Sequence, residues 1–125
     1  MARQWSIICV IAILLAPLGS GFAEKATEQY IPIGRSPGLS GKHTLIAKIV
    51  QVNAATRTLE LSDAVASHSV PLTSDTRIYL DKSKTGATNT LGAFSDLKVG
   101  DTVEVKFAHN ARSNPAEWIK VQKTP

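Results

Sequence analysis

Short stretches of strict apolar–polar alternation are the feature that most limits what this chain can fold into. Residues 58–62 read Thr-Leu-Glu-Leu-Ser, and residues 102–107 read Thr-Val-Glu-Val-Lys-Phe. Successive side chains of a β-strand point to opposite faces, so a period of two turns one side of each stretch toward a core and the other toward solvent. The sequence therefore predicts a β fold with Thr102, Glu104 and Lys106 facing outward.

Three further strands are predicted from their β-branched and aromatic residues. Residues 44–52 carry apolar groups on both faces, which predicts a bent strand buried partly on each side. Residues 69–72 and 76–80 predict one broken strand, and Pro71 indicates an edge or a bulge within it. Residues 116–122 predict the last strand.

A single helical turn is predicted between the third and fourth strands, over residues 94–101. Phe94 and Leu97 lie on the same side of this turn, and Gly100 ends it. The resulting order matches the five-stranded OB topology, and closing five or six short strands into a barrel removes edges that would otherwise aggregate. We therefore expect an all-β, OB-like barrel with one short helical turn over residues 44–122.

The first 23 residues predict a cleavable signal peptide. Arg3 precedes an apolar run over residues 7–16, which is about half the ~20 residues that a membrane-spanning helix needs, and small residues lead up to Ala23. Cleavage after Ala23 would remove the only Cys and the only Met, and would leave 13 basic against 10 acidic residues, a net charge of +3. We expect a periplasmic or secreted protein without disulfides or a membrane span, folded on its apolar core alone.

Residues 24–43 predict an irregular arm ahead of the barrel, because prolines and glycines break any regular period there. One apolar island interrupts the arm, and its residues Tyr30, Ile31 and Ile33 are expected to dock on the barrel or on a partner. On this interpretation, removal of residues 24–40 leaves the barrel folded and removes partner binding.

Three pieces of the chain carry a resemblance to a known domain family. They are residues 47–53 with 59–61, the stretch Asp-Leu-Lys-Val-Gly-Asp-Thr-Val-Glu-Val at 96–105, and residues 116–121. Across residues 44–122 the chain resembles a widespread bacterial domain of exported proteins that has no assigned function. The resemblance implies an OB-like barrel and no established activity.

A more distant similarity is to the periplasmic copper chaperones of the Cus efflux system, which are also small exported barrels. The copper site of that family is built from Met, His and Trp side chains. Here no Met remains after cleavage, and Trp118 has no His near it in sequence. Copper binding is therefore not implied for this chain.

Two short motifs have the letters of catalytic or nucleotide-binding loops. Residues 34–38 spell Gly-Arg-Ser-Pro-Gly, but a nucleophile elbow needs the backbone N–H of the residue after the serine, and Pro37 has none. Residues 38–44 resemble a phosphate-binding loop, but a strand follows, so no helix N-terminus meets the phosphate. We therefore expect neither an enzyme nor a cofactor.

A metal site is an alternative interpretation. His43 and His68 lie near strand starts and are expected at one end of the barrel, whereas His109 is expected at the other. None of the three shows a local ligand spacing such as H-x₃-H. With a nearby carboxylate, His43 and His68 would make a two-histidine site in a periplasmic metal-binding protein.

A basic loop is the second candidate contact surface. Its aromatic residue is Tyr79, and its basic residues are Arg77, Lys82 and Lys84. Such a loop would suit an anionic glycan or lipid surface. Nucleic acid is not expected, because Glu60 puts negative charge on the face that single-strand binders use. We therefore favour a non-enzymatic binding or accessory module of the cell envelope, with an envelope protein or an anionic surface as its partner.

Overall fold

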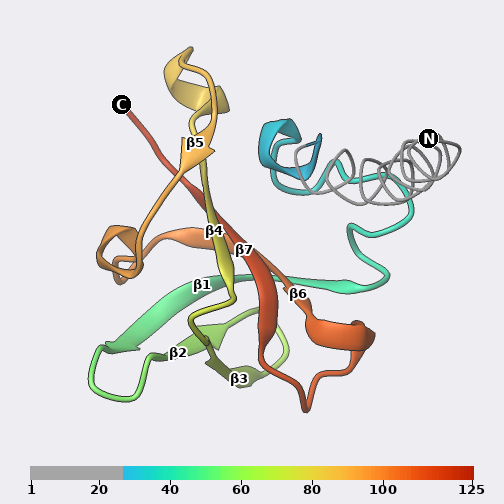
Figure 1. Ribbon diagram of the computed structural model, residues 1–125, viewed down its shortest axis with the longest axis vertical. Coiled ribbons are helices and arrows are strands. Elements are labelled where there is room, and N and C mark those ends of the chain that lie inside the picture. Colours follow the sequence, from blue (N-terminus) through green and yellow to red (C-terminus); the bar gives the residue numbers. More distant parts are fainter. Residues whose placement is uncertain (1–26) are drawn as a thin grey trace, which may run out of the picture.

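The computed structural model describes residues 27–125, which form a mostly-β domain on one mixed, seven-stranded sheet (Figure 1). The strands are β1 (Thr44–Asn53), β2 (Thr58–Ser62), β3 (Ser67–Pro71), β4 (Arg77–Asp81), β5 (Thr90–Leu91), β6 (Thr102–Phe107) and β7 (Ala116–Gln122). Short 3-10 helices occur at η1 (Ser83–Thr85), η2 (Phe94–Asp96) and η3 (Ala108–Asn110). The expected signal peptide, its cleavage site and the first residues of the arm lie outside the described part of the chain. No helix within residues 27–125 is long and apolar enough to cross a bilayer.

The strand order of the sheet is β3-β2-β1-β6-β7-β4-β5. Neighbouring strands are antiparallel except for β4 and β7, which run parallel. The sheet ends at β3 on one side and at β5 on the other, so in residues 27–125 it is not closed into a barrel. The closed barrel that the sequence predicts is therefore corrected to an open, mixed sheet.

The break in the predicted third strand explains why the sheet stays open. Its two halves are separate strands, of which β3 pairs with β2 and β4 pairs with β7. In the connection, the N–H of Thr73 donates to Oγ1 of Thr76 at 2.9 Å, and the N–H of Thr76 donates to the carbonyl of Thr73 at 3.1 Å. These backbone groups are used within the turn and so cannot extend either ladder. Pro71 ends the edge strand β3, as its missing N–H predicts.

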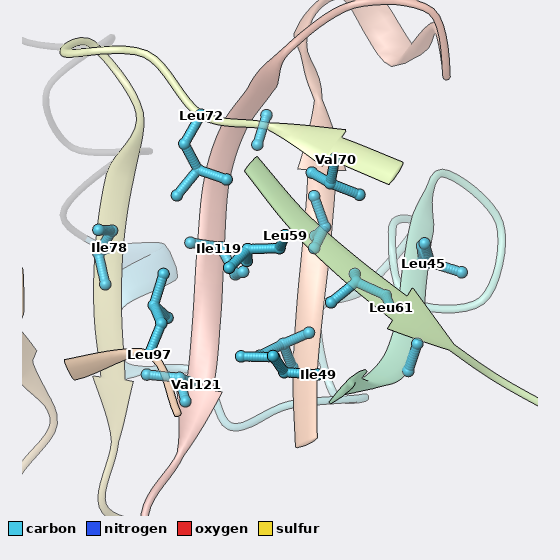
Figure 2. Packing of buried hydrophobic residues seen from close by; sticks show 14 of the residues in the cluster. Leu45, Ile49, Leu59, Leu61, Val70, Leu72, Ile78, Leu97, Ile119 and Val121 are labelled. Carbon is cyan, nitrogen blue, oxygen red and sulfur yellow. The ribbon is translucent and has the colours of Figure 1, made fainter. Parts of the chain in front are cut away.

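The apolar core lies on one face of the curved sheet (Figure 2). Leu59 and Leu61 of β2, Val103 and Val105 of β6, and Ile119 of β7 are all 0% exposed. Each fully buried side chain of this size contributes roughly 1.5–3 kcal/mol relative to exposure. The alternation in residues 58–62 and 102–107 therefore predicted the inward side chains correctly.

The first strand is irregular, but it is not buried on both faces as its apolar pattern predicts: Leu45 and Ile49 are buried, whereas Ile46 is 39% exposed and Val50 is 51% exposed. It pairs with both β6 and β2, and its register against β2 shifts between Ile49 and Gln51, as at a β-bulge. The carbonyl of Ile49 accepts the N–H of Gly100 at 2.7 Å, and Gly100 has a φ of +96°, a conformation that favours glycine. The expected helical turn is shorter than predicted. Only Phe94–Asp96 is helical, and the residues after it form the turn that contacts the bulge.

Candidate functional site

A row of buried polar side chains lies on the sheet face opposite the core. The strand register places Glu104, Lys120 and Tyr79 side by side across β6, β7 and β4. Their exposed fractions are 0%, 1% and 2%. Alternation correctly turns Glu104 away from the core, but the side chain is covered rather than solvated. Hydrogen bonds from residues 28–40 show that the cover is the arm, drawn in blue to teal in Figure 1.

Glu104 joins the arm to β6. Its Oε1 accepts the N–H of Gly34 at 3.0 Å, and its Oε2 accepts the hydroxyls of Ser40 at 2.6 Å and Thr44 at 2.8 Å. Gly34 has a φ of +84°, which an L side chain adopts only with strain. Burying a carboxylate is costly unless its oxygens are hydrogen-bonded, and both oxygens are bonded here. The predicted solvent-facing residue is therefore an anchor for the arm.

Lys120 joins the arm to β7. Its Nζ donates to Oε1 of Glu28 at 2.8 Å and to Oγ of Ser36 at 3.0 Å, and it lies 4.7 Å from the centre of the Trp118 ring. Trp118 is 3% exposed, and its ring centre lies 6.3 Å from that of Tyr79. This tryptophan is buried beneath the arm, whereas the core lies on the other face. The arm is thus part of the folded domain.

The contact between Ser36 and Lys120 resembles the serine–lysine pair of some hydrolases. In such a pair the base accepts the hydroxyl proton, but here the Lys120 ammonium donates to Ser36, and the Ser36 hydroxyl donates to Glu28 at 2.6 Å. Ser36 is also only 3% exposed, and Pro37 offers no N–H to an oxyanion. These bonds join Ser36 of the arm to Lys120 of β7 and to Glu28.

A groove of about 400 Å³ lies between the arm and the turn that follows β4. Its lining comes from three segments of the chain: Pro32, Ile33 and Arg35 of the arm, Asp81, Ser83 and Lys84 at the end of β4 and in η1, and Gln122 of β7. The arm and the basic loop are the two elements that the sequence predicts to contact a partner. A hydrogen bond joins them between Ile33 and Asp81, which are 48 positions apart in the sequence. The fold brings them together as the two walls of one groove.

Asp81 lines the groove and is bonded to both walls. Its Oδ2 accepts the N–H of Ile33 at 2.9 Å, and its Oδ1 accepts the N–H of Ser83 at 3.0 Å. Burial by itself raises the pKa of this carboxyl, but the hydrogen bonds from Ile33 and Ser83 and the charge of Lys120 outweigh burial. The pKa of Asp81 therefore lies below its ordinary value, and the group is ionised at neutral pH.

The other charged side chains of the groove are positive. Arg35 and Lys84 are exposed, and neither forms an ion pair with another described residue. The carboxylate of Asp81 is occupied by the two N–H groups of the walls. Among residues 27–125, the groove therefore presents two cationic groups without an ion-pair partner beside the apolar side chain of Ile33.

Most residues of the predicted apolar island and of the predicted basic loop do not line the groove. Ile33 and Lys84 line the groove. Tyr30 is 57% exposed and lies outside the groove lining, while Ile31 and Lys82 are half-buried and also lie outside it. Only one residue of each predicted surface therefore contributes to the groove.

Arg77 and Tyr79 do not form a single surface with the rest of the basic loop. Arg77 is exposed at the start of β4, whereas Lys84 lies beyond the end of that strand. Tyr79 is 2% exposed, and burial raises the pKa of its phenol. The sequence treats Tyr79 as available to a partner, but its side chain is buried beside the tilted ring of Trp118.

Five groove residues were not among the predicted contact residues: Pro32, Arg35, Asp81, Ser83 and Gln122. Asp81 directly follows an apolar strand residue, Leu80, and an aspartate at a strand end is a usable signal for a local N–H acceptor. Arg35 attracted notice only as a letter of the Gly-Arg-Ser-Pro-Gly motif. For Ser83 and Gln122 the sequence offers no such signal.

The two histidines of the alternative metal site do not meet. His68 lies opposite Leu61, and Leu61 lies opposite Ile49, which is roughly 20 Å along β1 from His43 at ~3.3 Å per strand residue. Nε2 of His68 lies 3.1 Å from Oδ2 of Asp63. Within residues 27–125 no three His, Cys, Asp or Glu side chains are grouped for a metal ion. The shared site predicted for His43 and His68 is therefore corrected to two separate surface histidines.

Comparisons of the chain with models of protein families, with curated proteins and with solved structures find no match. The resemblance of residues 44–122 to an exported bacterial domain therefore stays a prediction from the residues alone.

Proposed function

We propose that this chain is an exported, non-enzymatic binding module of the cell envelope, and that its groove takes an acidic, extended segment of a partner protein. The observation that carries the proposal is the meeting of the arm and the loop after β4 at one groove. Arg35 on one wall and Lys84 on the other are exposed and unpaired among the described residues.

The charges of the groove favour an acidic ligand. Two cationic side chains on facing walls attract carboxylates, and Arg35 offers a planar fork of donors that matches a carboxylate. Among the described residues, the acidic lining residue is Asp81, whose oxygens already accept two backbone N–H groups. Complementary charge of this kind sets the choice and the association rate of a partner more than the affinity.

The shape of the groove favours a peptide over a glycan or a lipid surface. Pro32 and Ile33 give an apolar wall beside the charges, which suits alternating apolar and acidic side chains. A sugar ring stacks best on an exposed aromatic ring, and none lines this groove. A lipid surface would be held by a cluster of basic residues on a broad face, whereas here two cations flank a recess of about 400 Å³.

Export, the lack of catalysis and the finer fold are parts of the same proposal. Export rests on the leader over residues 1–23, and the absence of an enzymatic role or a cofactor rests on motifs that lack their chemical requirements. The hairpin of β1 and β2 and the parallel pairing of β4 with β7 support an OB-like relationship, with β3 and β4 in the place of one broken strand.

A charge-reversal experiment tests the groove as the binding site. The mature chain, residues 24–125, is titrated with an acetylated and amidated Glu-Leu-Glu-Leu peptide, and binding is followed by NMR chemical shifts. An exposed charge pair contributes about 0.2–1 kcal/mol. The double variant Arg35→Glu/Lys84→Glu should therefore bind roughly tenfold more weakly, which corresponds to ~1.4 kcal/mol.

The matched control is Lys42→Glu/Lys98→Glu, which makes the same change in net charge at two exposed positions outside the groove. It should bind the peptide as the wild type does. Equal weakening of peptide binding by both double variants would mean that net charge alone causes the effect. The groove would then be rejected as the binding site. Binding of polygalacturonate or phosphatidylglycerol vesicles in place of the peptide would reject the peptide class.

A further inference from the structure

We infer that Asp81 is a positioning residue for the groove: its carboxylate holds the arm and the turn after β4 at the separation that ligand binding requires. The inference rests on the proposed function of the groove. It predicts that Asp81 promotes the binding of an acidic ligand although both are negatively charged.

The carboxylate of Asp81 is itself fixed in place. Asp81 pairs with Gln122 in the parallel ladder of β4 and β7, and its carbonyl accepts the N–H of Lys123 at 2.8 Å. From this fixed position one oxygen accepts an N–H of the arm, from Ile33, and the other accepts an N–H of the turn, from Ser83. The positions of both walls of the groove are therefore set by the same strand, β4.

Asn89 makes a second connection between the same two parts of the chain. Its Oδ1 accepts the N–H of Lys82 at 2.7 Å, and its Nδ2 donates to the carbonyl of Gln29 at 3.0 Å. The amide of Gln29 returns a bond of 3.3 Å to the carbonyl of Asn89. Asn89 is 7% exposed and does not line the groove, so it links the walls without contributing to the surface that meets a ligand.

The variant Asp81→Asn separates positioning from charge, because the two effects have opposite signs. Removing a negative charge from the groove strengthens the binding of an acidic peptide if only electrostatics act. An amide, however, has one oxygen and one NH₂ group, so it can accept only one of the N–H groups of Ile33 and Ser83. The other backbone N–H then faces the NH₂ group, which is also a donor. One wall of the groove is therefore no longer held by residue 81.

The experiment measures the affinity of the Glu-Leu-Glu-Leu peptide for Asp81→Asn, Asn89→Ala and Asp75→Asn. Asp75 is exposed beyond the opposite end of β4, and its change to asparagine matches the charge change at Asp81. We expect Asp81→Asn and Asn89→Ala each to weaken binding about tenfold, while Asp75→Asn binds as the wild type does. Stronger binding by Asp81→Asn, or unchanged binding by Asn89→Ala, overturns the positioning role.

A titration of the wild-type protein keeps the inference testable if a variant does not fold. The amide proton shifts of Ile33 and Ser83 should move together with one midpoint below the ordinary pKa of an aspartate, as Asp81 takes up its proton. Lys120 acts on this carboxylate through its charge, and Arg35 and Lys84 line the same groove; all three keep their protons in the acid range. Glu28, which is bonded to Lys120, is the neighbouring carboxylate, and Glu28→Gln is measured to separate its titration from that of Asp81. Two different midpoints, or no change at one of the amides, would show that Asp81 does not hold both walls.

The two proposals fail in different ways. If the charge-reversal pair weakens binding but Asp81→Asn strengthens it, the groove stands and the positioning role falls. If the two amides titrate together but the charge-reversal pair binds as well as its control, Asp81 joins the walls of a groove that is not the binding site.

Discussion

Three ionisable residues, Asp81, Glu104 and Lys120, are each 1% exposed or less, yet every one of them lies in a strand that also carries core residues. Their partners come mainly from the arm, through backbone N–H groups, hydroxyls and the carboxylate of Glu28. A buried charge stabilises a fold only while those partners stay in place, and the loss of one partner leaves a costly unpaired group. Conservative substitutions should therefore be costly at these positions.

The variant Glu104→Gln tests this at the arm anchor. One amide group cannot accept all three donors that Glu104 now accepts. We expect a loss of about 1.5–3 kcal/mol in the free energy of unfolding, measured by urea denaturation. The control is Glu117→Gln, whose side chain is 41% exposed and pairs with Lys106, and it should cost less than ~1 kcal/mol. Equal losses for the two variants would contradict an anchoring role.

Asp63 gives a prediction about pH. Its Oδ1 accepts the N–H groups of Ala66 and Val65, each at 2.8 Å, and its Oδ2 lies beside His68. These contacts, the Ala66 bond first, lower the pKa of Asp63 from 3.8 to about 2. Because the pKa is lower in the folded state, its stabilising effect is present above pH 3.8 and is lost as pH falls through about 2. A carboxyl carbon titration by NMR should show a midpoint near 2, and an ordinary midpoint near 3.8 would refute it.

At the scale of elements, strand positions followed from the sequence and the role of the arm did not. The period of two in residues 58–62 and 102–107 marks strands because it depends only on neighbours along the chain. Proline and glycine mark turns and irregular backbone over residues 31–43, whereas residues 27–30 of the predicted irregular arm are helical. Neither residue type carries information about where that backbone packs. The anchors of the arm join residues that are 70 and 92 positions apart, which no local pattern reports.

Truncation of the arm should destabilise the domain, contrary to the sequence-based expectation that the sheet folds without it. A chain beginning at Gly41 lacks Glu28 and Ser36 and uncovers Trp118 and Tyr79. At roughly 1.5–3 kcal/mol per large side chain, we expect on the order of 3–6 kcal/mol less stability, out of the about 5–15 kcal/mol typical of a domain. Urea midpoints measure this, with removal of the exposed residues 124–125 as the control. An unchanged midpoint would show that the arm is dispensable.

At the scale of the whole molecule, one sheet separates two different interiors. One face packs the apolar core, and the other packs buried charges and two aromatic rings beneath the arm. The groove exists only where the edge of that second layer meets the turn after β4. The shape of the groove is thus a property of the assembled layers, although the charges of Arg35 and Lys84 are visible in the sequence.

The sequence alone determined the β class of the domain, the inward side chains of β2 and β6, and the edge position of Pro71. Each of these depends on side-chain period or on the backbone chemistry of a single residue. Tertiary structure decided that the sheet stays open, that Glu104 and Lys120 are buried, and that Ile33 meets Asp81. Those outcomes depend on hydrogen bonds and packing between segments far apart in the chain, and such contacts exist only once the layers have assembled.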